Sequence, residues 1–451
     1  MRELELLTPE LFLDITDHLS SSDLNNLART CRLAYNKVDC WLYFRFAKEM
    51  YTWVANTGNE ATLHKALSHN APFTDDQLLF GMLSKVNERH RPHGIRIATL
   101  LISAQTSGTN IGIDIEWTSW YGHTLLQNAV HENIPSLVKM LLDAGANTGP
   151  FTPSLEDIQP FGYDDSLLRY AASKGSAEVL QLLLDSKRAG NIDQGALTAH
   201  LTPLAKAIES GSVDCAERLL NAGADPNILL FNNESPLCLA ARTPSLLGRP
   251  QIRSTMINLL LHRNASATNP ASNPPLRCAV LAGHTEAVTT LLSAPQTDVN
   301  YTTMPETSTA LTDAIKANQT PIALLLLEKC PALNVNKGQP LALAIRRLQV
   351  PVARAIRRTR RLSHASYMRG LAQAIALRKL ATNSMIWTMT CEMVSRRGSW
   401  MEAKAELETL YRLATAARNP SALVYLGKWV GNRRMCLYMQ GAFQRGDYPR
   451  D

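Results

Sequence analysis

The chain has 451 residues, of which 45% are hydrophobic and 19% are charged. This composition excludes a disordered protein, and the length exceeds one ordinary core, so we expect two or more folded units or an extended array. The net charge of +7 is unevenly distributed, because twelve basic residues and a single acid, Glu392, lie between residues 340 and 400. We therefore expect any electrostatic partner to bind at one end of the molecule.

The eight cysteines form no C-x-x-C pair and no ladder of Cys and His ligands. We interpret them as reduced core thiols of an intracellular protein, in the cytoplasm or the nucleus. The N-terminal sequence MRELELLTPELF carries early acids and no small-residue cleavage site, unlike a signal peptide. The longest apolar runs, such as 322–327, are far shorter than the roughly 18 to 20 residues that span a bilayer. We expect a soluble protein with no membrane contact.

The first fifty residues predict three short helices. Thr8 and Pro9 open a helix that places Leu11, Ile15 and Leu19 on one face. Ser22 and Asp23 begin a second helix, which carries Leu24, Leu27 and Cys31, and a third leads to Trp41. So many apolar residues in so short a segment leave apolar groups on its surface, which indicates a docking partner.

This segment resembles an F-box, because it has an apolar opening with Pro9 and Glu10, a D-L-x-x-L-x-x-x-C-R run from Asp23 to Arg32, and a distal tryptophan. Thr8 departs from the family pattern, since it separates Leu7 from Pro9. The resemblance implies docking on the small linker subunit of an SCF (cullin-RING) ubiquitin ligase. The residues implied in this contact are Leu7, Pro9, Leu11, Ile15, Leu24 and Leu27. The alternative is an N-terminal helical cap.

A leucine followed three residues later by an alanine recurs along the middle of the chain. These leucines are Leu126, Leu168, Leu204, Leu237, Leu276, Leu311 and Leu341, at spacings of 30 to 42 residues. A glycine or an asparagine, the residues that tolerate a left-handed helix C-cap, stands seven residues after most of them. Self-similarity at such a period is typical of a repeat protein, in which stacked units bury a shared core.

Each repeat predicts two short antiparallel helices, because a second apolar set follows the first, as in 137–142, 179–184 and 322–327. In TPLAKAIESGSVDCAERLLNAGADPNI (202–228), Thr202 is an N-cap, Pro203 occupies the first helical position, and Gly211 and Gly223 end the two helices.

These units resemble ankyrin repeats. The stretches 122–147 and 273–300 are similar to the one at 202–228. The resemblance implies a right-handed stack of helix pairs that binds proteins through its finger turns and concave side, with no chemistry. The predicted array covers 51–360, with units at 51–71, 122–147, 164–190, 202–228, 234–266, 273–300, 308–335 and 339–360. A spacer without a binding role is the alternative.

Three stretches depart from the repeat pattern. HRPHGIR (90–96) is expected to interrupt a degenerate unit at 78–115 as a surface loop. TPSLLGRPQIRS (243–254) stands where a glycine turn is expected, and the last unit lacks the GADxN tail. Insertions of this kind usually lie on one face of an array.

The region 361–451 loses the repeat but keeps helical periodicity, and we predict a helical C-terminal cap. Just before it, RAIRRTRR forms a basic cluster of Arg354, Arg357, Arg358, Arg360 and Arg361. Two interpretations stay open: a nuclear-import signal or patch for phosphate or acidic protein, and the solvated face of the last stacked helix. No aromatic residue interleaves the arginines, so we expect no nucleic-acid partner.

No motif for catalysis, a cofactor or a metal is present, and His123, His131 and His284 are expected to be structural residues of repeat turns. The fold class predicted is all-α: an ankyrin-repeat solenoid between an F-box-like three-helix unit (1–50) and the C-terminal cap. The predicted function is that of a non-catalytic adaptor, the substrate-recognition subunit of an SCF ligase, which captures an unknown protein target on the ankyrin groove. The alternative is a nuclear ankyrin-repeat transcriptional coregulator or scaffold.

Overall fold

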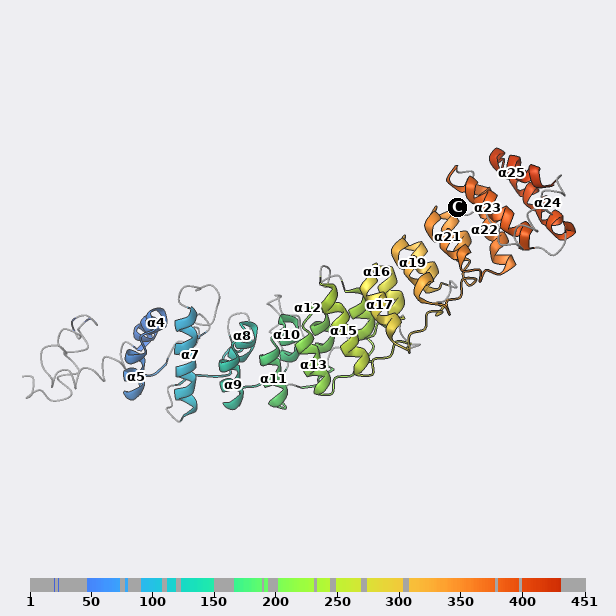
Figure 1. The fold of residues 1–451 in the computed structure, drawn as a ribbon. Helices are drawn as coiled ribbons and strands as arrows, with labels where there is room; N and C mark the ends of the chain where they lie inside the picture. The colour runs from blue at the N-terminus through green and yellow to red at the C-terminus, as the bar shows by residue number, and fades with distance from the viewer. Residues whose placement is uncertain are drawn as a thin grey trace, which may run out of the picture. The chain divides into compact units, whose positions relative to one another are not determined.

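The computed structural model of the chain divides into two compact units, Met1–Asp225 and Pro226–Asp451. Helices account for the regular structure of the described residues, apart from one isolated bridge between Thr118 and Thr124 (Figure 1). The residues that the structure describes are 20, 23, 47–73, 78–79, 91–107, 112–118, 123–149, 166–188, 190–193, 202–230, 233–243, 249–268, 274–302, 308–377, 380–396 and 400–430.

Helix pairs in two rows make up the described part of the first unit. Its helices are α4 (Ala47–Thr57), α5 (Glu60–Ser68), α7 (Arg91–Thr106), α8 (Leu125–His131), α9 (Pro135–Asp143), α10 (Leu167–Lys174), α11 (Ala177–Asp185), α12 (Pro203–Ser210) and α13 (Val213–Asn221). The first helices of successive repeats, α8, α10 and α12, pack on one another, and so do the second helices, α9, α11 and α13. Before them, α4 packs on α7, and α7 packs on α9.

The expectation of a surface loop at HRPHGIR is wrong for residues 91–96, which form the first turns of α7. Pro92 lies at the start of the helix, where its missing N–H has no intrahelical partner to lose. Ile97, Leu101 and Ile102 then bury one face of α7 completely. Burial of that face stabilises a helix that local punctuation alone disfavours.

The second unit is likewise built from helix pairs in two rows. Its described helices are α14 (Pro236–Arg242), α15 (Pro250–His262), α16 (Pro275–Ala282), α17 (Thr285–Ser293), α18 (Ala310–Lys316), α19 (Thr320–Lys329), α20 (Pro340–Arg346), α21 (Val350–Arg358), α22 (His364–Leu377), α23 (Leu380–Arg396), α24 (Trp400–Ala416) and α25 (Pro420–Val430). The first row runs α14, α16, α18, α20, α22 and α24, each packed on the next. The layering thus continues past residue 360, where the sequence repeat is lost.

The repeat leucines and alanines form the core. All seven leucines are at most 1% exposed, and all seven alanines three residues later are fully buried. Each buried leucine stabilises the fold by roughly 2 kcal/mol, and the small alanines let the first helices approach closely. The described cysteines, Cys215, Cys238, Cys278, Cys330 and Cys391, are free and buried, as predicted for core thiols.

The predicted punctuation is present at the helix ends. The Thr202 hydroxyl accepts a hydrogen bond from the Ala205 N–H at 3.2 Å, Pro203 follows it, and Gly211 ends the helix with φ +74°. Asn133 and Asn318, in the slot of that glycine, also adopt positive φ. Leu348 occupies the same slot of the last repeat with φ +59°, a backbone conformation that a leucine rarely adopts.

Asparagines at the end of the repeat turns join neighbouring repeats in the second unit. The Asn300 side chain donates to the Ala332 carbonyl at 2.9 Å and accepts from the Asn334 N–H at 2.6 Å. Asn227 and Asn336 make the same pair of bonds to the following turn, Asn336 to the Arg361 carbonyl and the Ser363 N–H. These links fix the spacing of successive turns.

Candidate functional site

The ends of the first helices in the first unit present a surface of stacked and charged side chains. His131 lies five residues after the repeat leucine, and its ring stacks on Tyr170 of the next repeat with 5.4 Å between centroids. The Lys174 ammonium lies 5.5 Å from the Tyr170 ring centroid. One repeat further, Lys206 forms an ion pair with Glu209 at 3.2 Å. Each unit carries such a row separately, and we call it the first-helix surface of that unit.

The equivalent position in the second unit carries Arg242, Leu281, Lys316 and Arg346. Arg242 forms an ion pair with Glu234 at 2.6 Å, and Lys316 donates to the Ser308 hydroxyl at 2.8 Å. Leu281 is 45% exposed although it is a large apolar residue. Protein-binding surfaces are typically built from aromatic, arginine and isolated apolar side chains with charged neighbours.

The sequence did not identify these residues as a site. Part of their signal is the register, since position five after each repeat leucine falls in the last turn of a first helix and is not fully buried in any repeat. The residue type at this position varies between repeats, so no shared letter marks it.

The buried histidine His284 has a structural role, as predicted for the histidines of repeat turns. It follows the left-handed Gly283 and makes a hydrogen bond with the backbone of Arg242 in the preceding repeat. Burial lowers the pKa of His284, and the nearby Arg253 guanidinium lowers it further. Gln349 occupies the same slot in the last repeat and donates to the Ile315 carbonyl at 2.9 Å. Burial also lowers the pKa of His123.

The arginine cluster does not form one surface. Arg357 is only 6% exposed, and its guanidinium binds both carboxylate oxygens of Glu392 on α23, at 2.6 and 3.2 Å. The Tyr367 hydroxyl donates to the same carboxylate at 2.6 Å. Arg357 therefore joins α21 to α23 and is set apart from the other four arginines, which are exposed.

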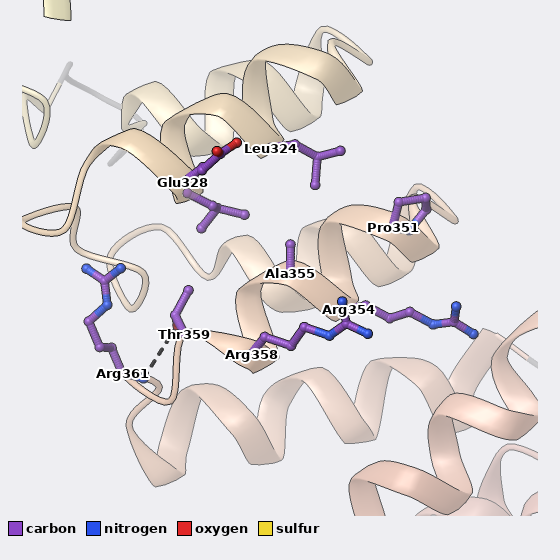
Figure 2. A pocket seen from close by; sticks show the side chains of 9 residues that line it. Leu324, Glu328, Pro351, Arg354, Ala355, Arg358, Thr359 and Arg361 are labelled. Atoms are coloured by element: carbon purple, nitrogen blue, oxygen red, sulfur yellow. Dashed lines mark hydrogen bonds between the residues drawn. The ribbon is translucent and has the colours of Figure 1, made fainter. Parts of the chain in front are cut away.

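The four exposed arginines differ in what their side chains face or contact. Arg354 and Arg358 lie one turn apart on α21 and face an open groove between α19 and α21 (Figure 2). The Arg361 guanidinium donates to the carbonyl oxygens of Pro331 and Leu333 in the preceding turn, the latter at 3.4 Å. Arg360 is exposed, has φ +55° and does not line the groove.

The six residues implied in linker binding, Leu7, Pro9, Leu11, Ile15, Leu24 and Leu27, lie outside the described residues. Between them the structure describes Ser20 and Asp23. The Ser20 hydroxyl accepts from the Asp23 N–H at 3.2 Å and donates to its carboxylate at 2.6 Å. Asp23 has a helical backbone, and a contact of this spacing is typical of a helix N-cap.

Two thiols of the described residues interact with each other in the core of the second unit. Cys238 and Cys278 hydrogen-bond to each other, which lowers the pKa of Cys238 to about 7. Both are buried in the repeat core, where a substrate has no access. Within the described ranges, no group of three or more His, Cys, Asp or Glu side chains is placed to hold a metal. No helix among the described residues is long and apolar enough to cross a membrane.

Paired helices stacked through leucine and alanine, with asparagine links between turns, define an ankyrin-repeat solenoid. A family model for ankyrin repeats in three copies matches residues 129–229, 168–271 and 251–340. The chain therefore carries ankyrin repeats, which bind protein partners and are typically non-enzymatic interaction scaffolds.

The chain is similar to ankyrin repeat, SAM and basic leucine zipper domain-containing protein 1 of Oryctolagus cuniculus, with 33% identity over 118 residues, which are 26% of this chain and 22% of that protein. The Mus musculus protein of the same name is 35% identical over 108 residues, or 24% and 21% of the two chains. The chain thus spans about a fifth of the length of these relatives.

Two solved structures are also similar. The human ASB11 ankyrin repeat domain has 26% identity and a TM-score of 0.37, covering 43% of this chain and 84% of that one. The ankyrin repeat domain of Bcl-3 has 22% identity and the same TM-score, covering 43% and 86%.

Proposed function

We propose that the chain is a non-catalytic adaptor that binds a target protein on the first-helix surface and docks on the linker subunit of an SCF ubiquitin ligase through residues 1–50. The observation that carries the first half is the register of that surface. In successive first helices, the position five residues after the repeat leucine holds side chains of varied chemistry, half-buried at His131, Arg242 and Lys316 and exposed at Leu281 and Arg346. A row of independent positions of this kind allows specific recognition without any change to the core.

Two parts of the row have the properties of binding anchors. The Tyr170 ring is held between His131 and Lys174, so little side-chain entropy is lost when a partner contacts it. Leu281 presents an apolar side chain among charged neighbours in the second unit. An exposed leucine of this kind can add apolar contact area when a partner covers it.

The sequence supports the second half of the proposal. The run from Asp23 to Arg32 follows the F-box pattern, and the Asp23 N–H donates to the Ser20 hydroxyl, a contact that is typical of helix N-termini. A box at one end and a recognition array after it is the arrangement expected of a ligase receptor.

The linker contact is tested with the full-length protein and purified SCF linker subunit in an equilibrium binding assay. Binding by the native chain, and its loss in a variant with Leu24→Asp and Leu27→Asp, are expected. The control is Leu281→Asp, an equal change of an exposed leucine outside the box, which should bind the linker as the native chain does. Absence of binding by the native chain would refute the ligase role.

Target capture is tested in cells by crosslinking, with quantitative comparison of the proteins attached to each variant. Tyr170→Ala should deplete a target bound by the first unit, and Leu281→Asp should deplete a target bound by the second unit. Val424→Asp on α25 is the matched control, because Val424 is 59% exposed and lies away from the first-helix row. A target that all three variants retain is not bound on the first-helix surface.

A nuclear coregulator is the second candidate, and the exposed arginines favour it. Arg354, Arg358, Arg360 and Arg361 are accessible, whereas a linear import signal that includes Arg357 requires α21 to unfold. A fluorescent fusion decides the point. If the fusion stays in the cytoplasm when nuclear export is blocked, the nuclear role fails.

A further inference from the structure

An open groove of about 630 Å³ separates the outer sides of α19 and α21 (Figure 2). It belongs to the second-helix row and is distinct from the first-helix surface of the proposed function. We propose that this groove is a second interaction surface, which binds an acidic peptide segment that carries an apolar side chain.

Both walls of the groove are single helical stripes. On α21, Pro351, Arg354, Ala355 and Arg358 follow the spacing i, i+3, i+4 and i+7, which places them on one face. On α19, Leu324, Leu327 and Glu328 do the same. Figure 2 shows the two arginines side by side on one wall and Leu324 and Glu328 on the other. The groove therefore presents a basic wall beside apolar groups.

The two arginines of this wall are available to a ligand. Neither Arg354 nor Arg358 makes an ion pair or a side-chain hydrogen bond with any residue that the structure describes. Glu392, the only acid between residues 340 and 400, is bound to Arg357. Two guanidinium groups one helical turn apart match carboxylates spaced along a peptide, and each forms bidentate bonds with such a group.

The rest of the groove selects the apolar part of the ligand. Leu324, Leu327 and Ala355 form an apolar lining that is large enough for one or two side chains. Arg361 lines one end, where its bonds to the carbonyls of the preceding turn hold it in place. The volume lies within the range of ligand sites, but the groove is open, which suits an extended chain better than an enclosed small molecule.

A peptide fits these walls better than a nucleic acid does. No aromatic side chain lines the groove, so bases have no platform on which to stack. Glu328 lies on the wall opposite the arginines and repels a uniformly charged phosphate backbone. A peptide turns its carboxylates to α21 and its apolar side chain to α19, and avoids that repulsion.

The test uses the full-length protein and a fluorescent peptide of repeated Glu-Glu-Leu units, with binding followed by fluorescence anisotropy. The native chain should bind this peptide at least tenfold more tightly than a peptide of Gln-Gln-Leu units and one of Glu-Glu-Ser units. A variant with Arg354→Glu and Arg358→Glu should lose at least tenfold in affinity. A variant with Leu324→Ser should also weaken binding, because it removes part of the apolar lining without changing the charge.

The matched control is Arg369→Glu with Arg412→Glu, the same charge change on two exposed arginines of α22 and α24 outside the groove. Thermal unfolding followed by circular dichroism checks that each variant folds. The proposal is overturned if the groove variant binds the peptide as the native chain does, or if the control variant loses as much affinity. It is also overturned if a single-stranded oligonucleotide of equal charge competes out the peptide and binds more tightly.

Discussion

At the residue scale, one acid determines what the arginine cluster can do. The Glu392 carboxylate accepts two hydrogen bonds from the Arg357 guanidinium and one from the Tyr367 hydroxyl. It therefore neutralises Arg357, the buried arginine of the cluster. A buried guanidinium without its carboxylate is strongly unfavourable, because desolvation of the charge is then uncompensated. The ion pair thus allows α21 to keep Arg357 inward while Arg354 and Arg358 face the groove.

We expect Glu392→Gln to lower the free energy of unfolding by about 2 kcal/mol, since the charged hydrogen bonds of a nearly buried guanidinium are weakened. Urea denaturation of the native and variant chains measures the change. Glu408→Gln is the control, because Glu408 lies 3.9 Å from Lys404 with both side chains 44% exposed, and its loss should change stability by less than about 0.5 kcal/mol. Equal effects of the two substitutions would contradict the structural role of Glu392.

His284 predicts a pH dependence of stability. Its folded-state pKa is lowered below the unfolded value of 6.5, so the unfolded chain binds a proton that the folded chain does not. The free energy of unfolding should therefore fall as the pH falls below about 6.5, and this contribution should vanish above that range. Besides Arg253, Glu286 faces this imidazole and partly opposes the shift.

The measurement is the urea midpoint of the native chain and of His284→Gln from neutral to mildly acidic pH. Glutamine is the chosen replacement because Gln349, at the equivalent position of the last repeat, donates a hydrogen bond to the Ile315 carbonyl. The variant should lose less stability on acidification than the native chain. Parallel curves would show that another group titrates.

At the element scale, polar contacts between turns hold the repeats in register. Asn300 contributes two hydrogen bonds to the next repeat, one through each end of its amide. Asn334, in that next turn, accepts only a local bond at 2.9 Å, from the Asn336 N–H. Two asparagines of the same segment therefore differ in whether they join repeats.

Asn300→Ala should lower the free energy of unfolding by about 1 to 3 kcal/mol, because two net hydrogen bonds are lost. It should also speed hydrogen exchange at the amide of Asn334, which donates to Asn300. Asn334→Ala serves as the control and should have a smaller effect. A larger loss in Asn334→Ala would mean that the local turn, and not the link between repeats, stabilises this region.

At the scale of the whole molecule, each helix pair contacts only its neighbours, so a perturbation should stay local. In the second unit, α22 packs on α20 so closely that a Cβ at Gly370 would lie 2.6 Å from the Leu341 side chain. The last repeat thus depends on helices that follow it, beyond the residues that resemble ankyrin repeats.

A chain that ends at Ser363 should lose protection from hydrogen exchange in α20 and α21, because Leu341 and Arg357 lose their partners on α22 and α23. Exchange in α8 to α13 should stay unchanged, since those helices belong to the first unit. A chain that ends at Val430 is the control. Loss of protection throughout the array would show long-range cooperativity in place of nearest-neighbour coupling.

The sequence by itself determined the repeat. Leucine and alanine spacing, the threonine and proline starts and the glycine or asparagine ends are local signals, and each acts within one helix or one turn. They predicted the helix pairs, the buried leucines and Gly211 correctly. They failed at HRPHGIR, where burial of Ile97 and Leu101 stabilises a helix.

Only the tertiary structure decided which arginines are available and which first-helix residues form a row. In the sequence, RAIRRTRR is one basic cluster, because the sequence gives the charge of each side chain but not the direction in which it points. In the fold, Arg357 pairs with Glu392, Arg361 binds the preceding turn, and Arg354 and Arg358 face the groove. The physical reason is that the partners of these side chains lie about 30 residues away along the chain, so no local pattern connects them.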